Sequence, residues 1–256
     1  MRVVPIVFSP TGGTQKVADI ILSKWGMPAE KVDLSDPKTD FSAVSLEKED
    51  IAVIAVPSFG GRVPALATER LEKVHGNGAM CVAVCVYGNR AYEDTLIELT
   101  DTAAKSGFRV IAGIAAIAEH SIMHQYATGR PDDEDKSELQ GFAEKILAKI
   151  SGEDMSAPQI PGNRPYKKAG GAGLVPKADH KCISCGLCAE KCPAQAIRRE
   201  NPRETDGKKC ISCMRCVSIC PQSARKVNGA MVSVAAMAIK KACSEKKHNE
   251  LFYKGQ

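Results

Sequence analysis

The amino-acid sequence predicts an α/β protein, with a doubly wound parallel sheet followed by a second, smaller α+β domain. Three observations predict it. Apolar runs alternate with amphipathic stretches over the first 150 of the 256 residues, which implies right-handed crossovers between parallel strands. Four Pro and four Gly then occupy the 25 positions from 154 to 178. Eight of the 11 cysteines follow, between Cys182 and Cys220.

The expected strands are short, nearly continuous runs rich in Val and Ile, as suits strands that helices cover on both faces. They lie at 2–8, 31–34, 51–56, 79–86 and 109–117. Helices are expected at 14–25, 65–74, 92–106 and 136–150, where apolar residues such as Leu139, Phe142 and Ile146 recur at helical spacing. One more helix is expected at 231–242.

These elements predict four segments: a first domain at 1–153, a linker at 154–178, a cysteine-rich domain at 179–227, and a C-terminal helix with a basic tail at 228–256. The linker should be extended near its prolines and flexible around 170–173. A chain of this length suits about two domains.

Charge is divided along the chain as the cysteines are. Residues 1–155 hold 16 basic and 23 acidic side chains, a net charge of −7, and residues 156–256 hold 19 and 7, a net charge of +12. The basic tail has no nucleic-acid motif beside it, and aromatic residues are only 5%, so we expect no nucleic-acid partner. No apolar run reaches the roughly 18 residues that cross a bilayer and no signal peptide is recognised, which predicts a cytoplasmic protein without a membrane partner.

The cysteines form an internal repeat with an offset of 28 residues. Each copy reads C-x2-C-x2-C-x3-C-P. Three cysteines at this spacing can bind one 4Fe–4S cluster, and the fourth binds the other cluster of a pair. The ligand sets are then Cys182, Cys185, Cys188 and Cys220 for one cluster, and Cys192, Cys210, Cys213 and Cys216 for the other.

Zinc and disulfides are the alternatives. Zinc takes four ligands per site, which gives no reason for the third cysteine at x2 spacing, and disulfides are disfavoured in a cytosolic chain. The stretch closely resembles the bacterial-type ferredoxins with two 4Fe–4S clusters, because both cysteine runs match in full. The resemblance implies a small fold of hairpins and helices, and one-electron transfer at low potential.

A Gly-rich loop follows the first expected strand and opens an expected helix. Its hydroxyls and backbone N–H groups can bind a phosphate at the helix N-terminus without a counter-cation. Alternatively, Thr14 is simply an N-cap. The candidate phosphate ligands are Ser9, Thr11, Gly12, Gly13 and Thr14.

Two further loops follow the third and fourth strands, at the edge where a doubly wound sheet binds its ligand. Each has glycines that let the backbone approach a ligand, and aromatic rings that can stack on a flat one. The candidates are Pro57, Ser58, Phe59, Gly60, Gly61 and Arg62 in one loop, and Tyr87, Gly88, Asn89 and Tyr92 in the other.

The three loops resemble those of flavodoxin. The resemblance implies FMN as the cofactor, strand order 2-1-3-4-5, and Tyr92 stacked on the flavin ring, with Phe59 on the other face, where flavodoxins often have Trp. Arg62 is then expected near the flavin, where its charge would stabilise an anionic reduced form. The whole chain resembles a ferredoxin family with an N-terminal flavodoxin-like domain, found in anaerobic bacteria and archaea.

The remaining candidates have plainer interpretations. Cys81 and Cys85 occupy alternate positions of an expected strand and are expected in the core, and Cys243 is expected to be a free thiol. His120 and His124 follow the last strand, where they either form hydrogen bonds within a loop or reach the flavin edge.

The leading interpretation is an electron-transfer flavo-iron–sulfur protein with FMN and two 4Fe–4S clusters, which exchanges electrons with redox partner proteins as a monomer or a homodimer. No acid–base pair marks a substrate pocket. One alternative is an FMN-dependent oxidoreductase that reduces a small acceptor, a quinone or an NAD(P)-linked compound, with electrons from the clusters. Another is a first domain that has lost FMN and serves only for docking.

Overall fold

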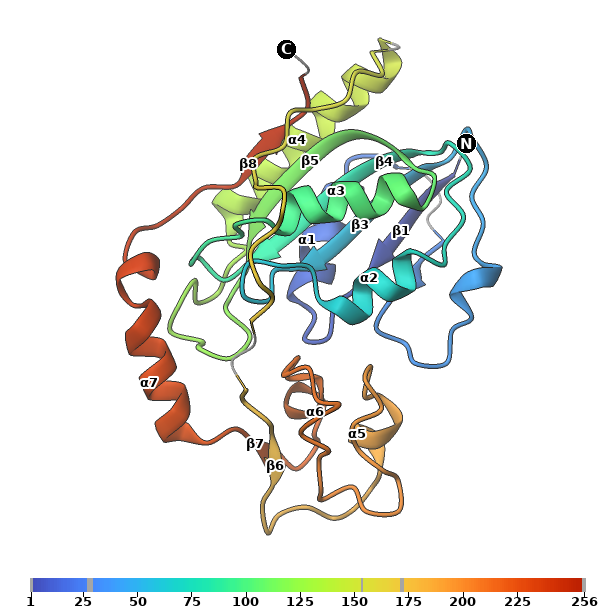
Figure 1. Cartoon of the computed structure of the whole chain (residues 1–256). Coiled ribbons are helices and arrows are strands. Elements are labelled where there is room, and N and C mark those ends of the chain that lie inside the picture. Colours follow the sequence, from blue (N-terminus) through green and yellow to red (C-terminus); the bar gives the residue numbers. More distant parts are fainter. Residues whose placement is uncertain (1, 27–29, 153, 171–172, 255–256) are drawn as a thin grey trace.

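The computed structural model describes residues 2–26, 30–152, 154–170 and 173–254. Its main sheet has six strands in the order β2-β1-β3-β4-β5-β8 (Figure 1). The first five are parallel, and β8 is antiparallel to β5. They are β1 (Val3–Val7), β2 (Val32–Asp33), β3 (Ile51–Pro57), β4 (Met80–Tyr87), β5 (Arg109–Ile117) and β8 (Glu250–Phe252). The expected order 2-1-3-4-5 of a flavodoxin-like sheet is confirmed.

Helices cover both faces of this sheet. The helices α1 (Gly13–Leu22) and α4 (Asp133–Ser151) pack on one face, and α2 (Ala65–Leu71) and α3 (Thr95–Lys105) pack on the other. Neighbouring strand residues serve opposite faces, so that Ile6 packs toward α2 and α3 and Val7 toward α1 and α4. Because both faces are buried, these strands are apolar throughout.

The expected elements of the first domain are present, and their ends differ from expectation by at most three residues. The largest extension is at α4, which begins at Asp133 rather than 136. The Asp132 side chain accepts from the Asp135 backbone, and the Asp135 side chain accepts from the Asp132 backbone, which forms a capping box. This reciprocal pair fixes the first turn of the helix. A short 3-10 turn at Phe41–Ala43 was not expected.

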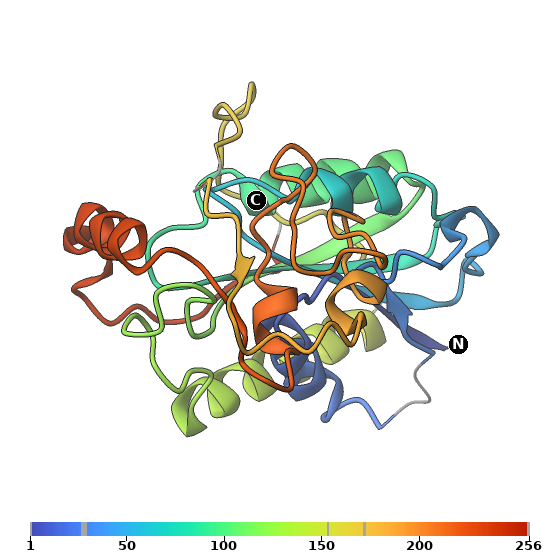
Figure 2. The same ribbon diagram turned by 90° about the horizontal axis from the view of Figure 1, so that it is seen from below.

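The cysteine-rich unit has little regular structure. The strand β6 (Lys177–Ala178) pairs antiparallel with β7 (Arg225–Lys226), and the one-turn helices α5 (Leu187–Glu190) and α6 (Arg215–Ser218) pack on each other. Figures 1 and 2 both place this unit against the edge of the main sheet where β1 and β3 end.

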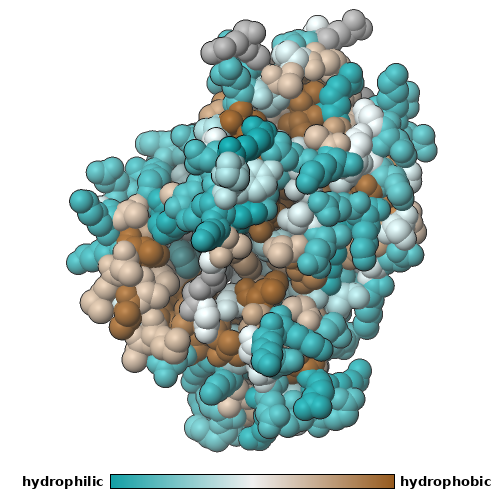
Figure 3. All heavy atoms as spheres, viewed as in Figure 1, coloured by the Kyte–Doolittle hydropathy of each residue, from teal (hydrophilic) through white to brown (hydrophobic). Residues whose placement is uncertain are grey.

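The helix α7 (Gly229–Ile239) follows, and a 3-10 turn at Lys241–Cys243 extends it, in place of the single helix expected at 231–242. Its side chains Met231, Val234 and Met237 are 49%, 64% and 67% exposed, and Figure 3 shows an apolar area over this helix. Among the described residues, no helix has both the length and the apolar character needed to cross a membrane.

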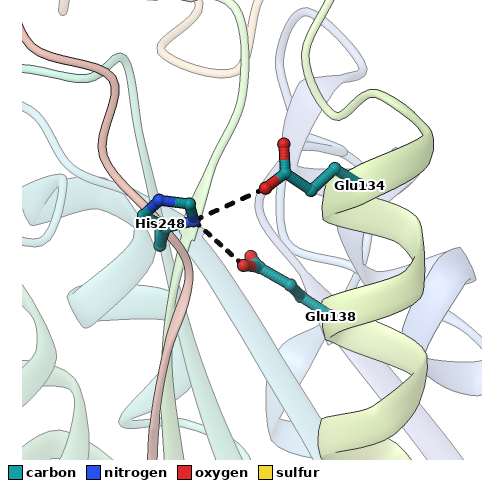
Figure 4. A group of neighbouring side chains, drawn as sticks. All are labelled: Glu134, Glu138 and His248. Atoms are coloured by element: carbon teal, nitrogen blue, oxygen red, sulfur yellow. Dashed lines mark hydrogen bonds and ion pairs between the residues drawn. The ribbon is translucent and has the colours of Figure 1, made fainter.

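The C-terminal tail returns to the first domain and supplies the sixth strand, β8, which the sequence did not predict. Asn249 is 6% exposed. Its Nδ2 donates to the carboxylates of Asp135 and Glu138, and its Oδ1 accepts from the Ile117 backbone. His248 lies beside Glu134 and Glu138 of α4 (Figure 4). The segment from Asn249 to Phe252 thus packs against the first domain.

The linker is bonded to the first domain over part of its length. The backbone N–H groups of Asn163 and Lys167 donate to the Asp94 carboxylate, at 2.9 and 2.7 Å. Arg164 forms a two-pronged ion pair with Asp101 of α3. These contacts hold residues 163–167 along α3. The expected flexibility around 170–173 falls partly on residues 171 and 172, which lie outside the described residues.

Candidate functional site

The eight cysteines of the repeat line two separate cavities with almost wholly apolar walls. Each cavity collects three cysteines from one copy of the repeat and the fourth from the other copy. One is lined by Cys182, Cys185, Cys188 and Cys220, together with Arg225. The other is lined by Cys192, Cys210, Cys213 and Cys216, together with Arg215. We call them the outer and the inner cavity, because the inner one lies nearer the first domain.

The backbone repeats its conformation around the two cavities. Ser184 and Ser212, at matching positions of the repeat, have φ of 56° and 53°, and Gly186 and Met214 have φ of 77° and 61°. These left-handed residues turn the chain between successive cysteines, so that three thiols can point inward. The Sγ atoms of Cys192 and Cys220 each accept a backbone N–H four residues later, both at 3.3 Å.

Burial disfavours thiolates in these cavities. It raises the pKa of Cys213 to about 12 and also raises the pKa of Cys188, Cys210 and Cys216. A bound cation reverses this preference, because a thiol that coordinates a metal is deprotonated. Each cavity brings four thiols together, and a backbone N–H donates to Cys192 in one and to Cys220 in the other. This arrangement fits two iron–sulfur clusters.

The loop at 9–14 between β1 and α1 presents unpaired backbone donors. The N–H groups of Thr11, Gly12, Gly13 and Thr14 donate to no protein group among the described residues. Ser9 fixes the loop, because its N–H donates to Ser35 Oγ and its Oγ accepts from the Gln15 N–H, both at 2.9 Å. Consecutive free amides at a helix N-terminus fit an anion such as phosphate. Thr14 makes no capping hydrogen bond, since Gly12 is the N-cap residue.

A cavity of about 200 Å³ opens beside this loop. Its walls come from both domains: Thr11, Gly13, Glu119, Ser121, His124 and Arg130 from the first, and Met214, Val217 and Ser218 from the cysteine-rich unit. The loop expected to bind a phosphate and the loop that carries the inner-cavity cysteines therefore face one another.

An ion pair joins the loop after β3 to the helix α3. Arg62 binds both carboxylate oxygens of Glu98, at 2.6 and 2.7 Å, and donates to the Lys167 carbonyl at 2.5 Å. The Arg62 charge is therefore balanced by Glu98. Ser58 shares a hydrogen bond with Thr95, and the linker covers Gly60, whose Cβ position lies 2.7 Å from the Gly170 carbonyl oxygen. Pro57 ends β3, Phe59 is half-buried, and Gly61 has a φ of 84°.

The loop after β4 binds the C-terminal tail. Tyr92 meets the buried Tyr87 edge to face, with ring centroids 5.3 Å apart, and its hydroxyl donates to Glu250 of β8 at 2.7 Å. Asn89 Nδ2 donates to the carbonyls of Cys243 and Glu245. Tyr92, expected to stack on a flavin ring, is thus already engaged with β8 and Tyr87. The partners in the tail lie more than 150 residues away along the chain, and no sequence pattern indicates them.

His120 packs under this loop, where a Cβ on Gly88 would come within 2.6 Å of it. Its Nδ1 accepts the backbone N–H groups of Ile122 and Met123, both at 3.2 Å. Burial lowers the pKa of the imidazole. Cys81 and Cys85 lie in the core as expected, and burial raises the pKa of both thiols.

Three arginines missed by the sequence analysis connect these sites. Arg215 lines the inner cavity and lies 3.4 Å from the carbonyl oxygens of Ser9 and Pro10, and Arg70 of α2 donates to the Pro193 carbonyl at 2.7 Å. Arg225 lines the outer cavity. The repeat offers a signal for two of them, because Arg215 and Arg225 occupy positions where the first copy has Leu187 and Ile197.

Residues 181–225 match the family described as the 4Fe-4S dicluster domain. No curated protein matches the chain. Among solved structures, a flavodoxin of Streptococcus pneumoniae TIGR4 is 22% identical with a TM-score of 0.42, and the match covers 57% of this chain and 99% of that one. Flavodoxin 1 of Bacillus cereus is 16% identical with a TM-score of 0.44, covering 58% and 98%. The apo form of the NADH:FMN oxidoreductase EmoB is 16% identical with a TM-score of 0.43, covering 60% and 91%.

The family match and the strand order of the main sheet describe different parts of the chain. The match falls on the unit with the two cysteine cavities, and the order 2-1-3-4-5 belongs to the sheet that precedes it. The chain therefore joins a flavodoxin-like domain to a ferredoxin-type 4Fe–4S domain.

Proposed function

We propose that this chain is an electron-transfer flavo-iron–sulfur protein, which holds two 4Fe–4S clusters and FMN and exchanges electrons with redox partner proteins. The observation that carries the proposal is the placement of the two four-cysteine cavities. They lie at the carboxyl edge of the flavodoxin-like sheet, and the inner one faces the loop at 9–14.

The two ligand sets follow from the cavities. The outer set is Cys182, Cys185, Cys188 and Cys220, and the inner set is Cys192, Cys210, Cys213 and Cys216. Apolar side chains line much of both cavities, and the backbone N–H groups of Ala196 and Ala224 donate to Cys192 and Cys220. Both features influence the potential of an iron–sulfur cluster.

The nucleotide is proposed to bind with its phosphate on the loop at 9–14. In the order β2-β1-β3, the connection reverses between β1 and β3, and open α/β sheets bind ligands at such a switch point. The free N–H groups of Thr11–Thr14 supply donors there. In the next two loops, Gly60, Gly61 and Gly88 lie against Gly170, Glu93 and His120. The side chains of Arg62 and Tyr92 hold the linker and the tail.

The position of Arg215 supports electron exchange between the inner cavity and the flavin site, because Arg215 lines that cavity and contacts the loop at 9–14. When bound, FMN can take up two electrons and release them singly, and each iron–sulfur cluster carries one. The protein's part is to hold the groups close, exclude water and orient them. The described titratable groups that line the cavity beside the loop are Glu119, His124 and Arg130, and Glu119 pairs with His124.

A cofactor count on the full chain, purified without oxygen, tests the proposal. We expect about eight irons and one FMN per chain. Cys213→Ser should lose about half of the iron, whereas Cys243→Ser, a buried thiol outside both cavities, should lose none. About four irons in the reconstituted wild type would reject the second cluster.

The flavin part of the proposal has its own test. Riboflavin lacks the phosphate, so it should bind at least about tenfold more weakly than FMN if the loop at 9–14 binds that group. Flavin fluorescence quenching measures both affinities. Equal affinities would reject the loop at 9–14 as the phosphate site. No binding of FMN to protein with intact clusters would instead favour a first domain that serves only for docking.

A further inference from the structure

Arg225 is a buried cation whose hydrogen bonds to the described part of the chain go to neutral oxygens. Arg225 is 2% exposed. Nη1 donates to the Pro202 carbonyl at 2.8 Å and Nη2 to Thr205 Oγ1 at 2.5 Å, whereas Nε is buried and has no partner among the described residues. A buried charge without a counter-ion is strongly destabilising. The position therefore calls for an anion and for one more hydrogen-bond acceptor.

The neighbouring cysteines could supply both the anion and the additional hydrogen-bond acceptor. Arg225 lines the outer cavity together with Cys182, Cys185, Cys188 and Cys220. Its Nη2 donates to Thr205, which lines the inner cavity together with Cys210 and Cys216. The cation thus lies close to both cavities.

The repeat shows that packing alone does not require an arginine here. At the offset of 28 residues, the first copy has Ile197 in the position of Arg225. Ile197 is 5% exposed and lines the inner cavity, as Arg225 lines the outer one. An aliphatic side chain therefore fills the same place in the same local fold.

We propose that Arg225 is the internal counter-cation of the iron–sulfur clusters, with its Nε–H donated to sulfur in the outer cavity. This rests on the proposed function. A 4Fe–4S cluster with four thiolates carries a net charge of about −2, and one more electron makes it more negative. A fixed cation favours the more negative form, so Arg225 raises the reduction potential and helps to retain the cluster.

The test uses three variants of the full chain, prepared without oxygen. Arg225→Met removes the charge and keeps the length, and Arg225→Lys keeps the charge. Arg198→Met removes one charge from an exposed arginine of the same domain. Each receives an iron count and a redox titration followed by electron paramagnetic resonance. We expect Arg225→Met to lower the midpoint potential of at least one cluster by a tenfold change in the reduction equilibrium, which is 59 mV for one electron.

Arg225→Lys should stay closer to the wild type than Arg225→Met, and Arg198→Met should match the wild type. If Arg225→Met loses iron instead, retention of iron in Arg225→Lys supports the role of the charge. Equal iron loss in both variants would overturn the proposal in favour of a steric role. Wild-type potentials with full iron in Arg225→Met would also overturn it. A wild type that never binds clusters would instead reject the proposed function itself.

Discussion

At the scale of single residues, His120 illustrates how a titratable group is held in one charge state. Both backbone donors on its Nδ1, from Ile122 and Met123, require a lone pair on that nitrogen. Burial acts in the same direction and lowers the pKa of the imidazole below its ordinary value. The neutral ring therefore serves as a fixed acceptor beneath Gly88.

The stability of the protein should fall as His120 becomes protonated. Because its folded pKa is below its unfolded pKa, the unfolded chain binds more protons, and stability is lost as the pH falls below about 6.5, by at most about 1.4 kcal/mol per pH unit. His120→Asn keeps an acceptor, Oδ1, but does not titrate. Urea unfolding at pH 7.5 and pH 5.5 should show a smaller loss for this variant than for the wild type.

His124 provides the matched control, because its side chain is 68% exposed and pairs with Glu119 at the surface. His124→Asn should keep the wild-type difference between the two pH values. An unchanged difference in His120→Asn would show that other groups cause the acid sensitivity.

Residues whose chemistry depends on local spacing could be predicted from the sequence. The crossed sets of cysteines follow from two short motifs, and the structure groups the same residues in its two cavities. Arg225 and Tyr92 could not be predicted in the same way. Their environments depend on burial and on partners from distant segments, such as Glu250 for Tyr92. The repeat marks the position of Arg225, where the first copy has Ile197, but it does not show the burial or the partners of this arginine.

At the scale of elements, β5 could be predicted from its local sequence, whereas β8 depends on partners from distant segments. The strand β5 is a continuous apolar run, buried on both faces, and its bounds match the expectation. The strand β8 has only three residues and follows a polar, lysine-rich stretch. Its place at the sheet edge depends on Asn249, whose three side-chain hydrogen bonds reach β5 and α4.

Asn249→Leu should therefore detach β8. The leucine leaves the Ile117 N–H without its acceptor and the carboxylates of Asp135 and Glu138 each without one donor. The expected cost is about 2–3 kcal/mol. Hydrogen exchange should accelerate in β8 and at the end of β5, with little change in β1 and β3.

A substitution at the neighbouring residue tests whether this effect is specific. His248 is 61% exposed and forms only surface ion pairs with Glu134 and Glu138, so His248→Gln should change stability by less than about 0.5 kcal/mol. Slow exchange in β8 of Asn249→Leu would show that backbone pairing with β5 is sufficient.

At the scale of the whole molecule, the ferredoxin-type domain is connected to the flavodoxin-like domain at both of its ends. The linker is bonded along α3, and the tail adds β8 to the main sheet. Between these ends, Arg70 and Arg215 join the two domains through backbone carbonyls. Pro and Gly content predicted the linker, but composition cannot show which surfaces meet.

These contacts predict that the two domains move as one body. A compact chain of 256 residues has a radius of gyration of about 18 Å, and small-angle X-ray scattering of the full chain should give a value close to this. The Arg70→Met, Arg215→Met double variant loses the hydrogen bonds across the interface. Its radius should increase, because the linker, the tail and weaker surface contacts then hold the domain in place less firmly.

Lys38→Gln is the control for this prediction. It removes an interdomain ion pair with Glu190 that is 3.5 Å long and has a Lys38 side chain 69% exposed, and such pairs contribute little. Its scattering should match the wild type. A wild-type radius well above that of a compact chain would instead indicate a domain that swings on its two connections. Electron exchange with the flavodoxin-like domain would then depend on that motion, and the contacts of Arg70 and Arg215 would describe only one of its positions.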